Sequence, residues 1–71
     1  MELSETIRRI REELGITQEN LAHSVYVSFS TVNRWENKKS APNRVTIAML
    51  VDFCEKQGVS NKLIEELRKC K

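Results

Sequence analysis

The chain is short of the residue types that mark several classes of protein. Its 71 residues include one proline, two glycines, one histidine and four aromatic side chains. No apolar run approaches the roughly 20 residues that a membrane helix needs, and no signal-like apolar segment follows the N-terminus. We therefore expect a cytoplasmic protein without a membrane-spanning segment.

The cysteines and the histidine do not form a metal-ligand pattern. Cys54 and Cys70 are separated along the chain, and His23 is the single histidine. Two cysteines in a helical chain rich in lysine and glutamate indicate free thiols in a reducing compartment rather than a disulfide. We expect no metal and no cofactor.

The sequence also lacks a set of side chains with the geometry of a catalytic site. An enzyme needs a nucleophile with a base, a paired carboxylate site or a metal cluster. Glu12-Glu13 and Glu65-Glu66 are adjacent residues, so the carboxylates of each pair separate onto different faces of a helix. His23 is expected at the surface, near the end of a helix. We expect neither an enzyme nor a small-molecule substrate.

What the chain does contain is typical of one small folded domain spanning residues 1–71. Hydrophobic residues make up 39% and charged residues 31%, which is ordinary for a globular protein. The formal net charge is +2, and it is unevenly distributed. Residues 1–32 carry five Glu and three Arg, residues 33–44 carry four basic side chains and one Glu, and residues 45–71 carry five basic and four acidic side chains. Positive charge therefore gathers between residues 33 and 44, which slightly favours contact with nucleic acid.

Apolar spacing and residues that start or end helices predict five helices and no strand. The first helix has one apolar stripe, and Gly15 ends it; the stripe consists of Leu3, Ile7, Ile10 and Leu14. Ser4 or a neighbour starts this helix. Pro42 closes a basic loop, and the fourth helix begins after a cap at Asn43 and ends at Gly58.

One pattern recurs three times and marks the starts of the other helices. An apolar residue precedes Ser or Thr, and a second apolar residue follows four positions later, which is an N-cap with a hydrophobic staple. The three instances are Ile16-Thr17 with Leu21, Val27-Ser28 with Val32, and Val59-Ser60 with Ile64. They predict helices over residues 18–24, over residues 29–37, and from residue 61 to the C-terminus.

The fourth and fifth helices each allow two interpretations. The fourth has a main stripe of Ile47, Leu50, Val51 and Cys54, widened by Val45, Ala48, Met49 and Phe53. Either the other helices nearly surround it, or its surplus apolar surface meets a partner. The fifth has a stripe of Leu63, Ile64, Leu67 and Cys70, which either closes the core or forms a homodimer seam.

The third helix is unusually polar for the middle of so small a chain. At about 100° per residue, Thr31, Val32, Trp35 and Glu36 gather on one side, and Ser30, Asn33, Arg34 and Asn37 on the other, with Phe29 on the boundary. Val32 and Trp35 anchor such a helix in a core. A short helix, a turn and this second helix make a helix-turn-helix over about residues 17–37, whose second helix fits a DNA major groove about 12 Å wide.

The stretch "GITQENLAHSVYVSFSTVNRWENKKSAP" resembles the Cro/repressor-type (Xre-like) helix-turn-helix family over about residues 7–50. The resemblance is carried by the opening Gly15-Ile16-Thr17-Gln18, the pair Leu21-Ala22, the helix start Val27-Ser28, the finish Val32 and Trp35-Glu36-Asn37, and the loop proline Pro42. It implies an all-α, five-helix, lambda-repressor-like DNA-binding domain.

The resemblance also implies roles for individual residues. It implies base contacts from Phe29, Ser30, Asn33 and Arg34, and phosphate contacts from Gln18, Thr31, Asn37, Lys38, Lys39 and Arg44. Gln18 would also brace the recognition helix. Arg11 and Glu36 would form a partly buried ion pair that belongs to the scaffold.

Two residues depart from the family pattern. Tyr26 stands where the family usually has Gly, so either the turn is reshaped or Tyr26 adopts the positive φ that Gly tolerates. Phe29 stands where a polar residue is more frequent. It either packs on a thymine methyl, tucks against the edge of the core or belongs to a protein interface.

The expected function is therefore sequence-specific binding of double-stranded DNA as a transcriptional regulator. The resemblance implies a homodimer on a pseudo-palindromic operator with half-sites roughly 34 Å apart. The short chain resembles a Cro-like repressor or a compact controller from a phage, plasmid or other mobile element. The alternatives are a DNA-binding fragment of a longer repressor, or a protein-interaction module such as an antitoxin, with Met49, Phe53 and the last helix as partner surface.

Overall fold

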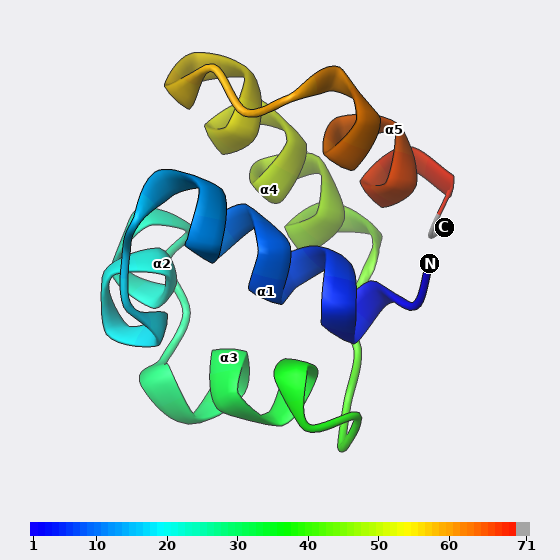
Figure 1. Ribbon diagram of the computed structural model, residues 1–71. Helices are drawn as coiled ribbons and strands as arrows, with labels where there is room; N and C mark the ends of the chain where they lie inside the picture. The colour runs from blue at the N-terminus through cyan, green and yellow to red at the C-terminus, as the bar shows by residue number, and fades with distance from the viewer. Residues whose placement is uncertain (70–71) are drawn as a thin grey trace.

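The predicted all-α fold is confirmed. A computed structural model describes residues 1–69 of the chain. Within these residues the chain forms five helices, arranged as in Figure 1: α1 Leu3–Leu14, α2 Gln18–Ser24, α3 Phe29–Glu36, α4 Arg44–Gln57 and α5 Asn61–Lys69. The described residues form no strand. Each predicted boundary agrees to within one residue, although α3 ends at Glu36 instead of Asn37, and the expected continuation through Cys70 lies outside the described residues.

Side-chain caps start three of the helices. The side-chain oxygens of Thr17, Ser28 and Asn43 each accept a hydrogen bond from the backbone N–H three residues later. Each bond satisfies one of the backbone donors that the first turn of a helix leaves without an internal partner. α1 differs, because Glu2 is its N-cap and makes no side-chain capping bond, and Ser4 is buried inside the helix.

The first four helices end in the same way. A residue with positive φ follows each helix, and the N–H of the next residue bonds back to a carbonyl five positions earlier, as in a Schellman motif. Those bonds run from Ile16 to Arg11, Val27 to Ala22, Lys39 to Arg34, and Val59 to Cys54. The positive-φ residues are Gly15, Tyr26, Lys38 and Gly58. Glycine fits this geometry without strain, so the two non-glycine residues are the exceptions.

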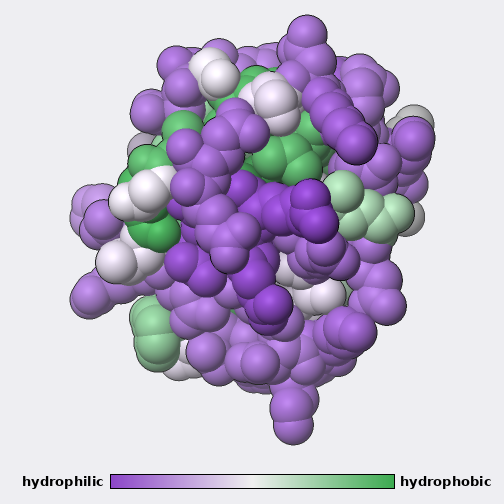
Figure 2. All heavy atoms as spheres, in the orientation of Figure 1, coloured by the Kyte–Doolittle hydropathy of each residue, from purple (hydrophilic) through white to green (hydrophobic). Residues whose placement is uncertain are grey.

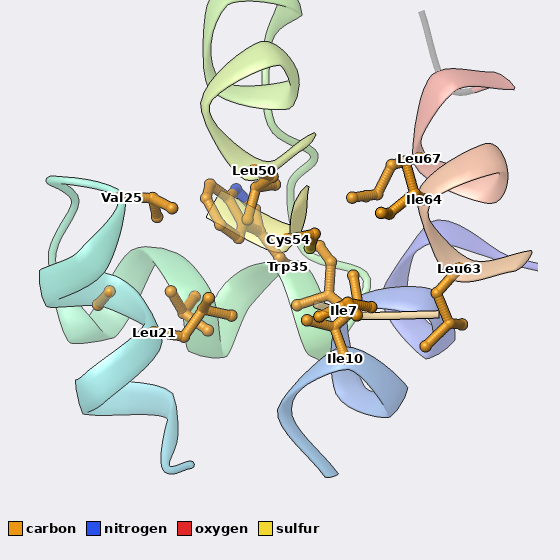
Figure 3. Packing of buried hydrophobic residues seen from close by; sticks show 13 residues of the cluster. Ile7, Ile10, Leu21, Val25, Trp35, Leu50, Cys54, Leu63, Ile64 and Leu67 are labelled. Atoms are coloured by element: carbon orange, nitrogen blue, oxygen red, sulfur yellow. The ribbon is translucent and has the colours of Figure 1, made fainter. Parts of the chain in front are cut away.

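All five helices contribute to one hydrophobic core. Ile7 and Ile10 of α1 and Leu50 of α4 are fully buried in it. Trp35 is 4% exposed, and its indole lies beside Leu50 in Figure 3. The prediction that Trp35 anchors α3 in the core is therefore confirmed.

The described part of α5 closes this core. Leu63, Ile64 and Leu67 are all buried in the cluster, so these three residues are not available as a homodimer seam. Cys70, the fourth member of the predicted stripe, lies outside the described residues.

α4 satisfies both interpretations in part. Ile47, Leu50 and Cys54 are buried, and Val51 and Phe53 are partly buried against the core. Val45 remains 67% exposed and Ala48 is also exposed, so α4 keeps some apolar surface. That surplus lies on Val45 and Ala48, whereas Phe53, predicted as partner surface, packs on the core.

The arrangement separates α3 from the two C-terminal helices. In Figure 1, α1 runs through the middle, with α3 packed on one side of it and α2 packed against α3, and α4 and α5 lie on the other side, where α5 contacts both α1 and α4. Figure 2 shows mainly hydrophilic side chains over the lower part of the same view, where α3 lies. Among the described residues, no helix has the length and apolar character required to span a membrane.

Candidate nucleic-acid interface

α3 is fixed on its inner side and polar on its outer side. Val32 is fully buried and Trp35 nearly so, while Ser30 and Arg34 are exposed on the other side of the helix. Asn33 is half-buried between the two sides. The helical wheel drawn from the sequence therefore describes the real orientation of α3. Because Val32 and Trp35 are buried in the core, the outer side chains project from a helix whose orientation is fixed by packing.

Phe29 lies at the start of α3 with 53% of its surface exposed. It does not belong to the buried core cluster or to the partly buried residues packed against that cluster. The alternative in which Phe29 tucks into the core edge is thus disfavoured. The exposed ring stays available for an apolar contact with a thymine methyl group or with a protein.

A partly buried ion pair ties α3 to α1. Arg11 donates from Nε to Glu36 Oε2 at 2.6 Å and from Nη2 to Glu36 Oε1 at 2.8 Å. Its third nitrogen, Nη1, donates to the carbonyl of Ile16 at 3.2 Å, which also holds the segment before α2. These are the two residues that the family resemblance pairs. The bidentate geometry fixes the relative position of the two helices.

The charge of Glu36 is kept despite its burial. Its side chain is 2% exposed, and Arg8 adds a second positive charge at 3.8 Å. Burial raises the pKa of Glu36, but the hydrogen bonds from Arg11 and Gln18 and the charges of Arg11 and Arg8 outweigh it, so the pKa falls below its usual value. Glu36 is therefore an ionised carboxylate that can only accept hydrogen bonds.

A chain of hydrogen bonds leads from this carboxylate to the outer side of α3. It passes through the side chains of Gln18, Asn33 and Asn37. Gln18 Nε2 donates to Glu36 Oε1 at 3.0 Å, and Asn33 Nδ2 donates to Gln18 Oε1 at 3.1 Å. Asn37 Nδ2 donates to Asn33 Oδ1 at 3.1 Å and to the Asn33 carbonyl at 2.8 Å. Gln18, expected both at a phosphate and as a brace for the third helix, is thus bonded to α3 in the free protein, as the bracing role requires.

The basic residues expected at phosphates lie at and beyond the end of α3. Lys38 and Lys39 are exposed, and Lys38 Nζ lies 3.0 Å from Glu2 Oε1 in an exposed ion pair. Arg44 is exposed at the first position of α4. Thr31 is half-buried, and its hydroxyl lies 2.8 Å from the Ser28 hydroxyl at the start of α3.

Tyr26 resolves the question that its sequence position raised. Its φ is 62°, so it adopts the left-handed conformation that the family usually gives to Gly. Its side chain is 84% exposed, so contacts of the tyrosine ring itself do not offset the strain of this conformation. The turn is therefore not reshaped, and α2 and α3 keep the usual connection.

The family resemblance implied that Gln18 braces α3, but it did not name Asn33 as the partner, and the two residues lie 15 positions apart across the turn. No spacing rule signals such a contact. Two other contacts could have been predicted from spacing. Asn33 and Asn37 are four positions apart on one helix, and Arg8 lies one helical turn before Arg11, so both arginines can face Glu36. Within residues 1–69, no group of three or more His, Cys, Asp or Glu side chains could hold a metal ion.

A comparison of the sequence with known protein families agrees with the helix-turn-helix geometry described above. The model of a family described as "Helix-turn-helix" matches residues 7–58, which is most of the chain. The chain belongs to the Cro/repressor-type (Xre-like) helix-turn-helix family. The match covers the whole of α2, the turn, α3 and α4, so the residues of the candidate interface lie inside it.

One relative is the "HTH-type transcriptional activator BcrR" of Enterococcus faecalis, which is 34% identical over 53 residues. The match covers 75% of this chain and 26% of the relative, so the chain spans about a quarter of the relative's length. No solved structure matches the chain significantly. The family and this relative together support a DNA-binding transcription regulator, without indicating a repressor or a Cro-like type.

Proposed function

We propose that this helix-turn-helix protein binds double-stranded DNA sequence-specifically and regulates transcription, with α3 in the major groove. The observation that carries the proposal is the orientation of α3. Val32 and Trp35 hold its apolar side in the core, while Ser30 and Arg34 project from the opposite side. A helix with this polarity, following a short capped helix and a turn, has the geometry that reads base edges.

Recognition is divided between two groups of side chains. Phe29, Ser30, Asn33 and Arg34 face the base edges, and an arginine in this position suits the two acceptors of guanine. Gln18, Thr31, Asn37, Lys38, Lys39 and Arg44 are proposed to contact phosphates and so to set the position of α3 in the groove. On DNA, Lys38 exchanges its exposed pairing with Glu2 for a phosphate, which costs little because exposed ion pairs are weak.

We also propose that the protein binds as a homodimer on a pseudo-palindromic operator. The exposed apolar side chains of α4, Val45 and Ala48, are flanked by Arg44 and Asp52. Ala48 lies midway between these two charges, so two antiparallel copies of α4 crossing there would bring each Arg44 opposite the Asp52 of the second copy. This charge pattern favours a second copy as the occupant of the surface. A cytoplasmic location accompanies the DNA-binding function.

A protein-interaction module is the second candidate function, and the same exposed patch on α4 favours it. An antitoxin-like protein would use Val45 and Ala48 to hold a partner of a different kind. The outer side of α3 distinguishes the two functions, because an interaction module does not need the side chains of Ser30, Asn33 and Arg34.

In vitro selection from random duplex DNA, with the wild-type protein and Arg34→Ala in parallel, tests the proposal. We expect a two-fold-symmetric motif for the wild type. The variant should lose preference at one base pair of each half-site, by about 1–3 kcal/mol if Arg34 reads a guanine. If no motif is enriched, or if Arg34→Ala selects the same motif as the wild type, the result would favour the protein-interaction module.

A further inference from the structure

The hydrogen bonds that connect Glu36 to the outer side of α3 allow only one arrangement of the amides between them. Glu36 is an ionised acceptor, so Gln18 must turn its Nε2 toward it and its Oε1 away. An amide oxygen can only accept, so Asn33 must turn its Nδ2 toward Gln18. The buried carboxylate therefore determines which way the amide of Asn33 points.

The amide of Asn33 keeps unused hydrogen-bonding capacity in this arrangement. Of its two Nδ2 protons, one is donated to Gln18, and of the two lone pairs on Oδ1, one accepts from Asn37. One donor and one acceptor remain on a half-buried side chain that adjoins the exposed Arg34. In the major groove, adenine presents an acceptor at N7 and a donor at N6, whereas guanine presents two acceptors. The remaining capacity of Asn33 therefore complements adenine.

We propose that Asn33 reads an adenine in each half-site, and that Gln18 and Glu36 are positioning residues that fix its amide for that base. The inference rests on the proposed DNA-binding function and deepens it by naming a base. Gln18 holds the Asn33 amide before DNA arrives, so less side-chain freedom is lost on binding. Without Gln18, the amide of Asn33 can turn its oxygen and nitrogen in either direction, and the preference for adenine weakens.

The proposal gives Gln18 a role that a phosphate contact does not have. A phosphate contact strengthens binding to every sequence by the same factor. A residue that positions Asn33 alters the ratio between sequences, at the one base pair that Asn33 reads. A comparison of binding affinities between DNA sequences therefore distinguishes the two roles.

The test compares the wild type with Asn33→Ala, Gln18→Met and Gln57→Met. Each protein is titrated onto the selected operator and onto operators with every substitution at each base pair of one half-site. Met replaces Gln with a side chain of similar length that has no amide, and Gln57, exposed at the end of α4, receives the same change as a control. Circular dichroism and melting temperature verify that each variant is folded. Gln18→Ala is a second variant if Gln18→Met does not fold.

The expected result is an adenine preference at one position, of roughly 5- to 150-fold in the wild type. Asn33→Ala should reduce that ratio to about one. Gln18→Met should reduce the ratio at the same position and at no other, and Gln57→Met should leave all ratios unchanged. Combining Asn33→Ala with Gln18→Met should lower the ratio no further, because both changes remove the same interaction.

Three outcomes would overturn the inference. Gln18→Met could weaken binding to all sequences equally and keep the adenine preference, which would make Gln18 a phosphate contact only. Asn33→Ala could leave every ratio intact, or could remove a preference for a base other than adenine. In each case the DNA-binding function itself would stand, because the wild type would still select a motif. Absence of any motif for the wild type would instead remove the proposed function and this inference together.

Discussion

Arg11 in α1 and Glu36 in α3 lie 25 positions apart in the sequence and form a bidentate ion pair through bonds of 2.6 and 2.8 Å. The pair joins α1 to the last residue of α3. The Glu36 carboxylate is nearly inaccessible to water, whereas Arg11 keeps 19% of its side-chain surface exposed. A pair with this burial is expensive to break from one side, because the remaining charge is left in a poorly solvated site.

Replacement of Arg11 by Met should therefore destabilise the protein by about 3 kcal/mol, at the lower end of the range for a stranded buried charge. The lower end applies because Arg8 remains 3.8 Å from Glu36. Urea unfolding followed by circular dichroism measures the change. Arg9→Met is the matched control, since Arg9 pairs with Glu5 on an exposed helix surface, where such pairs contribute about 0.3–0.5 kcal/mol. Equal losses in the free energy of unfolding for the two variants would show that burial does not increase the contribution of the Arg11–Glu36 pair.

The lowered pKa of Glu36 predicts how its contribution depends on pH. Because the pKa is lower in the folded than in the unfolded protein, ionised Glu36 stabilises the fold fully above its usual pKa of 4.5. That contribution is lost as the pH falls through the lower, folded pKa. The difference in melting temperature between wild type and Glu36→Gln should thus be constant near neutral pH and shrink in acid. A difference that is independent of pH would contradict the pKa shift.

Tyr26 should be a site where a substitution increases stability. Tyr26→Gly relieves a left-handed conformation that costs a non-glycine residue roughly 1–2 kcal/mol, and the exposed ring gives up little packing. After the loss of chain entropy at Gly, we expect a gain of about 1 kcal/mol in the free energy of unfolding. Gly58→Ala is the reciprocal experiment, because φ is 75° there and a new Cβ meets no atom within 4 Å. It should destabilise through the backbone alone, and a neutral result would remove the argument for Tyr26.

Lys39→Ala should weaken binding to all DNA sequences alike. Lys39 is exposed beyond the end of α3. If it contacts a phosphate, its removal lowers the slope of log affinity against log salt by about one. Lys62→Ala removes the same charge from the exposed start of α5, across α1 from α3, and should leave the slope unchanged. A loss confined to the operator would instead make Lys39 a base-reading residue.

The Cys54 thiol should be unreactive in the folded protein. It is fully buried, and burial, with the nearby charges of Glu13 and Glu55, raises its pKa to about 12. Almost no thiolate, the reactive form, is then present at neutral pH. In a Cys70→Ser background, a colorimetric thiol reagent should react with Cys54 only after urea is added. Rapid reaction without urea would show that the core around α4 opens readily.

The helices and the buried anchors of α3 could be predicted from the sequence because they depend on local rules. Thr17, Ser28 and Asn43 cap helices through bonds to residues three positions away, and Gly15 and Gly58 end helices through their own conformational freedom. The period of the apolar residues likewise determined that Val32 and Trp35 face inward. The candidate base-reading residues followed from that period and from the family resemblance, and their roles remain predictions.

Only the tertiary structure decided that the side chains of Gln18 and Asn33 meet. Gln18 and Asn33 lie on different helices, and their hydrogen bond exists because α2 and α3 cross at one angle, set by packing that no short sequence window encodes. The same holds for Tyr26, where the sequence allowed a strained turn or a reshaped one. The packing of α2 against α3 selected the strained turn, because the energy of a buried core outweighs a local cost of one or two kcal/mol. Local chemistry therefore determined the elements of this protein, and long-range packing determined how its polar residues are connected.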